Sequence, residues 1–307
     1  GIEPRTALRE LEGAILRQDP ALDLPGGTGA SQVGPRARAV LVAACARSAM
    51  PRLAALGEQL AGAPVHELVL AVTVPQADEL EAAGRELEAL RSGAADRGVV
   101  ARAAAFTSLT PGADIARLAV EQEADLLLVD APGGLLEDAG LLKLLDDAPC
   151  DVAVAVGHGR IGDGAVLVPF SGATHDWAAI ELGAWLARAL GRSLRLAGAS
   201  TGATGRDASR LLASASLAVR RGLGVAAEPM LVEPEPAALV AAAGDAGVVV
   251  VGLTDRWRRQ GLGRARTALA TSQASTTVLV RRGLRPGGLA PRESDTRFTW
   301  TVAVRGG

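Results

Sequence analysis

The sequence predicts an α/β protein that consists of two similar halves, each with a parallel sheet. Short apolar runs rich in β-branched residues alternate with segments of helical periodicity, which is typical of parallel strands buried on both faces. The runs also recur at nearly constant spacing: their starting positions differ by 126, 122 and 126 residues. Such spacing indicates an internal duplication. The paired runs are 39–44 and 165–170, 124–130 and 246–252, and 152–156 and 278–280.

The first half is expected to span residues 37–157. Its strands alternate with helices, of which the clearest are 78–98 and 114–124, so that right-handed crossovers would connect the strands. The expected strands are 39–44, 66–74, 99–108, 124–130 and 152–156.

The second half is expected to span residues 164–283 and follows the same order. Trp177 and Trp185 lie two turns apart on its first helix, where large aromatic side chains indicate packing in the core or between the halves. The expected strands are 165–170, 193–199, 225–233, 246–252 and 278–280, and the helices are 175–190, 206–222, 235–247 and one from about Arg258.

The two ends of the chain lack this pattern. Residues 1–36 combine one amphipathic helix, with Leu8, Leu11, Ile15 and Leu16 on a shared face, and a linker rich in glycine, proline and serine. Residues 284–307 form a second linker-like tail, which carries a short β-like segment from Phe298 to Val304.

Composition limits the function classes. The net charge of −2 over 307 residues gives no general attraction to nucleic acid or anionic membranes. No apolar run reaches the roughly 18–20 residues of a membrane span, and the charged first residues do not form a signal peptide, so a cytoplasmic location is expected. Lys143 is the only lysine, and arginine therefore supplies nearly all of the positive side-chain charge.

Few side chains have the spacing of a chemical site. Cys45 and Cys150 lie in apolar contexts, where small buried side chains are expected. His66, His158 and His175 are isolated, and we expect each to lie on the surface or in a loop. No Ser-His-Asp, Walker or zinc pattern is present, so neither catalysis nor a metal site is predicted.

Two segments carry a resemblance to a known family. "DAPCDVAVAV" (147–156) and "VLVPFSGATHDWAAIELGAWLARALG" (166–191) resemble the last and first elements of universal stress protein domains, and the resemblance covers residues 37–283. It implies tandem domains of the adenine nucleotide alpha hydrolase-like fold, with strand order 3-2-1-4-5 in each half. It also implies that the halves pair through their last strands as an intrachain pseudo-dimer.

A second, local resemblance concerns residues 1–25. "GIEPRTALRELEGAILRQDPALDLP" is similar to the C-terminal end of the bacterial transcriptional activator domain found in regulators of the antibiotic regulatory type. It implies that the chain descends from, or belongs to, a longer transcriptional regulator.

The family resemblance also implies where a nucleotide would bind. Nucleotide-binding members place an Asp after strand 1; after strand 4 they carry a glycine, a second glycine three residues on, and Gly-Ser or Gly-Thr nine residues later. In the second half Ser171 replaces the Asp, Gly252 matches the first glycine, Asp255 replaces the second, and Arg264 begins the final pair. The candidate nucleotide-binding residues are Ser171, Gly172, Gly252, Asp255, Gly261, Gly263 and Arg264.

The first half offers a weaker counterpart, formed by Asp130, Gly133 and Gly134. No acidic residue follows its first strand, and Asp138 stands at the Gly-Ser position, where a carboxylate opposes anion binding. Five arginines at positions 256, 258, 259, 264 and 266 surround the glycines of the second half. They either bind an anion or form a solvated helix face.

The predicted function is a non-catalytic stress-response or regulatory module with degenerate nucleotide sites. The alternative is a universal stress protein that binds ATP or AMP through the loop after strand 4 of the second half; no other cofactor is assigned. A homodimer or a protein partner is compatible with either, whereas direct DNA binding is not expected because no helix-turn-helix pattern is present.

Overall fold

The computed structural model describes residues 38–62, 66–131, 136–157, 161–199, 206–254, 256–272 and 276–283. The helix expected within residues 1–36 and the tail 284–307 lie outside this part of the chain, as do Gly133, Gly134, His158 and Asp255.

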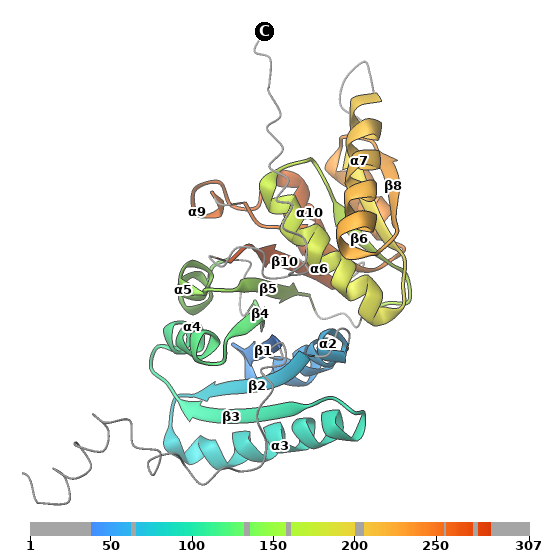
Figure 1. The fold of residues 1–307 in the computed structure, drawn as a ribbon. Coiled ribbons are helices and arrows are strands. Elements are labelled where there is room, and N and C mark those ends of the chain that lie inside the picture. Colours follow the sequence, from blue (N-terminus) through green and yellow to red (C-terminus); the bar gives the residue numbers. More distant parts are fainter. Residues whose placement is uncertain are drawn as a thin grey trace, which may run out of the picture. The chain divides into compact units, whose positions relative to one another are not determined.

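The first half alternates strands and helices as the apolar periodicity predicts (Figure 1). Its strands are β1 (Arg38–Ala44), β2 (His66–Val74), β3 (Ala101–Thr107), β4 (Ala124–Asp130) and β5 (Asp151–Val156). Its helices are η2 (Arg47–Ala49), α2 (Met50–Gly62), η3 (Ala77–Glu79), α3 (Leu80–Asp96), α4 (Pro111–Glu121) and α5 (Ala139–Asp147).

The second half repeats this alternation. Its strands are β6 (Ala165–Pro169), β7 (Leu194–Ala199), β8 (Ala227–Val232), β9 (Ala246–Gly252) and β10 (Thr276–Arg281). Its helices are α6 (Thr174–Leu190), α7 (Arg206–Leu223), α8 (Pro236–Ala243), α9 (Trp257–Gln260) and α10 (Arg264–Thr271).

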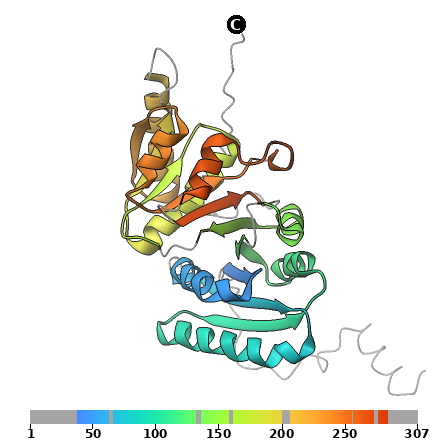
Figure 2. The same cartoon turned by 180° about the vertical axis from the view of Figure 1, so that it is seen from behind.

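The ten strands form a single sheet in the order β3-β2-β1-β4-β5-β10-β9-β6-β7-β8. Each half therefore has the strand order 3-2-1-4-5, which confirms the predicted order. The two expected sheets are one continuous sheet, because β5 and β10 pair antiparallel along Val152–Val156 and Thr277–Arg281. The other pairings are parallel (Figures 1 and 2).

The first helix of each half approaches its sheet in the same way. A Cβ on Gly57 of α2 would lie 2.4 Å from Val42 Cγ2, and a Cβ on Gly183 of α6 would lie 2.6 Å from Val168 Cγ2. Gly57 and Gly183 are 126 residues apart in the sequence, and so are Val42 and Val168. The absence of a side chain at these two positions therefore allows α2 and α6 to pack closely on β1 and β6.

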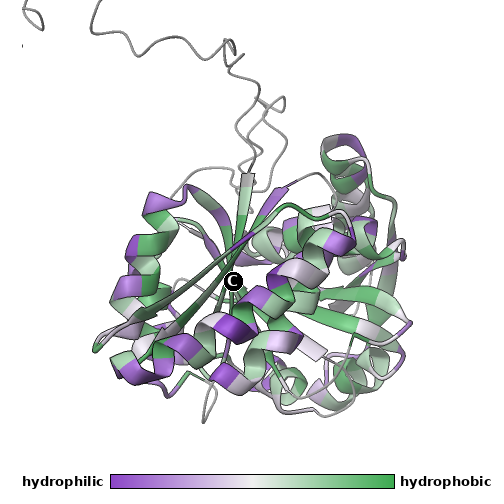
Figure 3. Ribbon diagram, turned by 90° about the horizontal axis from the view of Figure 1, so that it is seen from below, coloured by the Kyte–Doolittle hydropathy of each residue, from purple (hydrophilic) through white to green (hydrophobic). Residues whose placement is uncertain are grey.

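Helices cover both faces of the sheet. Side chains of α2, α3, α6 and α7 pack on one face, and those of α4, α5, α8, α9 and α10 pack on the other. In Figure 3 the inner strands are mostly hydrophobic, whereas hydrophilic residues are found mainly on the helices. In the described part of the chain, no helix combines the length and apolar character that crossing a membrane would require.

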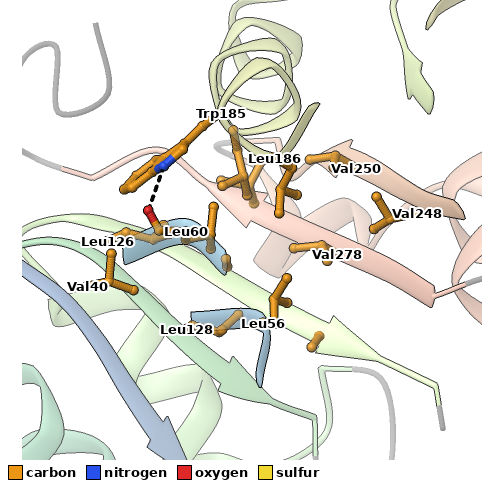
Figure 4. Close-up of a cluster of buried hydrophobic side chains, with 14 of the residues drawn as sticks. Val40, Leu56, Leu60, Leu126, Leu128, Trp185, Leu186, Val248, Val250 and Val278 are labelled. Carbon is orange, nitrogen blue, oxygen red and sulfur yellow. Dashed lines mark hydrogen bonds between the residues drawn. The ribbon is translucent and has the colours of Figure 1, made fainter. Parts of the chain in front are cut away.

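The core is continuous across the junction of the halves (Figure 4). The indole N–H of Trp185 on α6 donates to the backbone oxygen of Leu60 on α2 at 2.9 Å, which confirms that this tryptophan packs between the halves. The ring of His66 lies 4.7 Å from that of Trp185, centroid to centroid. His66 is buried at the start of β2, so the expectation of a surface or loop position was wrong for it.

Candidate functional site

The site predicted by the sequence lies where the strand order reverses. In open α/β sheets, ligands bind beyond the carboxyl ends of the strands at such switch points. One switch point lies between β1 and β4, and the other lies between β6 and β9. The residues that follow β1 and β6, and those that end β4 and β9, therefore decide what can bind.

In the first half a carboxylate of the chain itself occupies the turn after β1. The backbone N–H of Cys45 donates to Asp130 Oδ1 at 2.6 Å, and that of Ala46 donates to Asp130 Oδ2 at 3.2 Å. Asp130 is the last residue of β4 and is only 3% exposed. Burial raises the pKa of this carboxyl above its usual 3.8, although the backbone N–H groups and Arg52 act in the opposite direction.

Cys45 adjoins this carboxylate and is not a reactive thiol. Burial raises the pKa of Cys45 to about 12, and the negative charges of Asp130 and Asp138 add to the effect. Because the thiolate is the nucleophile, the side chain is inert at neutral pH. Cys45 therefore supplies a backbone donor to the turn and no chemistry.

In the second half a different carboxylate occupies the corresponding turn after β6. Asp176 Oδ2 accepts from the backbone N–H of Ser171 at 2.7 Å, from the Ser171 hydroxyl at 2.6 Å and from the backbone N–H of Ala173 at 3.3 Å. Asp176 lies in the first turn of α6 and is 1% exposed. Ser171 follows its strand at the position, 126 residues on, that Cys45 has in the first half. The same backbone donor is thus satisfied internally in both halves.

Asp176 also contacts an arginine side chain from the other side of the switch point. Arg266 of α10 lies with Nη2 3.4 Å from Asp176 Oδ1 and 2.5 Å from His175 Nε2. His175 Nε2 in turn lies 3.2 Å from Asp176 Oδ1. Three side chains therefore link the start of α6 to the helix that follows the glycine turn after β9.

Gly252, the last residue of β9, contacts the backbone of α6. A Cβ on Gly252 would lie 2.3 Å from the backbone oxygen of His175 and 3.1 Å from the Asp176 nitrogen. Its φ is not in the left-handed region, so the close approach of α6 explains the glycine. In the aligned strand of the first half, Asp130 occupies this position.

The remaining candidates of the second half lie in the turn before α10. Gly261 (φ 58°) and Gly263 (φ 75°) have left-handed backbones with open space around them, and Arg264 begins α10 with an exposed side chain. Among the described residues, it is Arg266 rather than Arg264 that reaches the turn after β6. Asp255, Gly133 and Gly134 lie outside the described residues, so their places in the site are not part of this geometry.

Sequence reasoning missed Asp176, and it named Arg266 only as one of five arginines near the glycines. His175 was expected to be isolated on the surface or in a loop, but it lies in the first turn of α6 beside Asp176 and Arg266. The available signal was the acidic residue in the first turn of a helix, since such a residue often accepts hydrogen bonds from the backbone N–H groups at the helix start. Arg266 had no local signal, because its partner lies 90 residues away in the sequence.

The turn after β6 also brings three polar side chains together. The Ser171 hydroxyl donates to Asp176 Oδ2 at 2.6 Å, and His175 Nε2 lies 3.2 Å from the other oxygen of the same carboxylate. Within the described ranges, no group of three or more His, Cys, Asp or Glu side chains is placed to hold a metal ion.

Solved structures with the same architecture identify the fold. A universal stress protein from Archaeoglobus fulgidus has a TM-score of 0.58 at 14% identity, over 81% of this chain and 100% of its own. The chain has the universal stress protein fold. No family model and no curated protein matches the sequence, so the similarity lies in the structure.

The universal stress protein fold is shared by proteins with different roles. A protein of unknown function from Pseudomonas aeruginosa has a TM-score of 0.57 at 16% identity, over 80% of this chain and 93% of its own. The cytoplasmic domain of a prokaryotic cation chloride cotransporter has a TM-score of 0.56 at 13% identity, over 79% of this chain and 95% of its own. Because one fold serves several functions, the function of this chain must be argued from its own site.

Proposed function

We propose that this chain is a non-catalytic regulatory or scaffolding module of the universal stress protein fold, in which both nucleotide sites are closed from within. One observation carries the proposal: the backbone N–H after the first strand donates to a buried carboxylate in both halves, at Cys45 and at Ser171. The two carboxylates come from different elements. Both nevertheless accept a hydrogen bond from the same backbone position, which supports closure of the site as a property common to the two halves.

The closure acts against a nucleotide in two ways. A phosphate or ribose would have to displace a carboxylate from N–H groups that are already satisfied, and breaking charge-assisted bonds of this kind costs about 1.5–3 kcal/mol each. The displaced Asp130 or Asp176 would then face the ligand's negative charge in a poorly solvated position, which is unfavourable. Each factor of ten in affinity corresponds to about 1.4 kcal/mol, so closure alone weakens binding at least tenfold.

Descent from a transcriptional regulator and origin by duplication belong to the same proposal. The correspondence of Gly57 with Gly183, and of Cys45 with Ser171, supports duplication of one ancestral unit. The activator-like segment supports attachment to a regulator; it lies in residues 1–25, outside the described residues.

The second candidate function is binding of ATP or AMP by the turn before α10. It is favoured by Arg256, Arg259 and Arg264, which are exposed and form no ion pair with the other described residues. Arg258 differs, since it pairs with Asp146 and lies over the ring of Trp257. Exposed arginines attract phosphates only weakly at physiological salt, because the solvent ions screen them.

Calorimetry with ATP and Mg²⁺ at physiological salt distinguishes the two functions. Closed sites predict no binding, or a Kd on the order of 100 μM or weaker. A stoichiometric site of low-micromolar affinity would overturn the proposal and establish the second candidate. A variant with Arg256, Arg259 and Arg264 replaced by serine would then locate the site, because its affinity should fall if this turn holds the phosphates.

A further inference from the structure

The two edge strands of the sheet differ in whether a further strand could pair with them. β3 forms one edge and β8 forms the other, and the two strands correspond in the two halves. Ala103 pairs in register with Leu70, and Pro229 pairs with Leu196, 126 residues later in both strands. At matched positions, one edge strand therefore has alanine and the other has proline.

Among the described strands, none pairs with the outer edge of β3. Leu68 N donates to Val100 O at 2.9 Å, and Ser108 N donates to Val74 O at 3.0 Å, so the even-numbered residues of this stretch face β2. In a parallel strand the odd-numbered residues then turn their N–H and C=O groups outward. In β3 these residues are Ala101, Ala103, Ala105 and Thr107, and each has the N–H group that a further strand requires.

The β8 edge is closed to such an addition. Proline has no N–H, and it is tolerated in edge strands where the missing donor would face outward. Proline and charged side chains are known means of preventing strand pairing at an edge. Pro229 provides the first of these on β8, and β3 has alanine at the matched position. Charge does not distinguish the two edges, because Arg102 of β3 and Glu228 of β8 occupy matched positions and each forms an ion pair with the neighbouring strand.

Exposed apolar side chains flank the open edge. Val100, just before β3, is 64% exposed, and Leu109, just after it, is 91% exposed. Single exposed apolar side chains are common on protein surfaces, and Leu231 on β8 is 48% exposed, so this exposure is compatible with a covering segment but does not by itself distinguish the two edges.

We propose that residues 298–304 of the same chain add to the outer edge of β3 as an eleventh strand. These residues lie outside the described part of the chain. Their sequence, FTWTVAV, alternates large apolar residues with threonine and alanine, which is typical of a strand with one covered face. Phe298, Trp300, Val302 and Val304 form the apolar side of that strand.

The length of the chain permits this addition. β10 ends at Arg281, and six strand spacings of about 4.8 Å separate β10 from an added strand beyond β3, or about 29 Å. The 14 residues 284–297 reach up to about 46 Å when extended. The segment can therefore reach β3 within its own molecule.

Amide hydrogen exchange, resolved by NMR, tests the proposal with two truncated chains. The first ends at Thr296 and lacks the segment, and the second ends at Val304 and is the matched control. In the full chain and the control, the amides of Ala101, Ala103 and Ala105 should exchange about fivefold more slowly, or slower still, than in the chain that ends at Thr296. The inward amides of Arg102 and Ala104 should exchange alike in all three.

Two further measurements keep the test decisive. A synthetic peptide of residues 297–307 should restore protection to the chain that ends at Thr296. Ala103→Pro, which copies Pro229 onto β3, should abolish protection of Ala101 and Ala105 in the full chain while Arg102 stays protected. Equal exchange in the full and truncated chains would overturn the proposal. So would protection that rises with protein concentration, because the strand would then come from a second copy.

Discussion

At the residue scale, the two halves satisfy one backbone donor with carboxylates from different positions. Asp130 comes from the end of β4, and Asp176 comes from the first turn of α6. Gly252 of the second half has the position that Asp130 has in the first. Because glycine has no side chain, the backbone of α6 lies close to this position. The position of the carboxylate therefore differs between the halves, whereas both halves have its bond to the turn after the first strand.

Asp130→Gly should open the first switch point, because it places in β4 the residue that ends β9. The variant loses the carboxylate that accepts from Cys45 and Ala46. The free energy of unfolding should fall by about 2–4 kcal/mol. Inorganic phosphate should recover part of this loss, since an anion can take the bonds of the missing carboxylate. Thermal unfolding in phosphate and in chloride, at matched ionic strength, measures the recovery.

Asp163→Gly is the control for this experiment. Asp163 is exposed and forms one surface ion pair, with Arg192 at 2.9 Å. Phosphate should raise the melting temperature of Asp163→Gly no more than that of the unmodified chain. A phosphate effect on Asp130→Gly that is equally small would show that the turn after β1 does not bind anions.

At the element scale, the sequence predicted the order of strands and helices but not the closure of the site. Apolar periodicity found the strands because burial on both faces selects long apolar runs, as in β4 and β9. It could not find the pair Arg266–Asp176, since the contact depends on how α10 and α6 meet across the sheet. The glycine pattern predicted that Gly252 allows a close approach of the backbone to a phosphate. In the structure it allows a close approach of the backbone of α6.

Gly252→Ala tests the role of that contact. The added methyl group would meet the backbone of His175, which cannot move without shifting the first turn of α6. The free energy of unfolding should fall by about 1–3 kcal/mol, as is usual for overpacking in a dense core. Chemical denaturation measures it. Gly62→Ala, at a helix end with no atom within 4 Å of the added carbon, should change stability by about 0.5 kcal/mol at most. Equal stabilities of the two variants would refute this role of Gly252.

At the scale of the whole molecule, the described residues of both halves share one sheet and the two hydrophobic clusters on its faces. Besides the β5–β10 ladder and the Trp185 hydrogen bond, a buried carboxylate links the halves where β10 ends. Asp151 of β5 accepts from Gly283 N at 2.7 Å and from Arg282 Nη1 at 3.4 Å, and Arg282 also pairs with Glu181 of α6 at 2.5 Å. Asp151 is 1% exposed.

Asp151 should make the stability of the molecule depend on pH. Burial raises the pKa of its carboxyl above 3.8, although Arg282 and the Gly283 N–H oppose this. The folded chain therefore keeps this proton to higher pH than the unfolded chain. Its contribution to stability is complete below about pH 4 and is lost as the pH rises through the folded-state pKa.

Unfolding free energies between pH 4 and 7 measure this contribution by comparison with Asp151→Asn, which cannot titrate. The stability of the unmodified chain minus that of Asp151→Asn should decrease as the pH rises. An increase would mean that Arg282 and Gly283 hold the pKa below its usual value. Asp163→Asn, at an exposed position, should show no comparable trend.

The closed switch points are the central claim, and a site-resolved titration tests them most directly. The amide resonances of Cys45, Ala46 and Ser171 report on three of the four backbone N–H groups that donate to the two carboxylates. On addition of ATP with Mg²⁺ at physiological salt, these resonances should not move until the nucleotide reaches about 100 μM or more. Saturable shifts at low-micromolar nucleotide, in either half, would show that the carboxylates yield to the ligand and would contradict the claim.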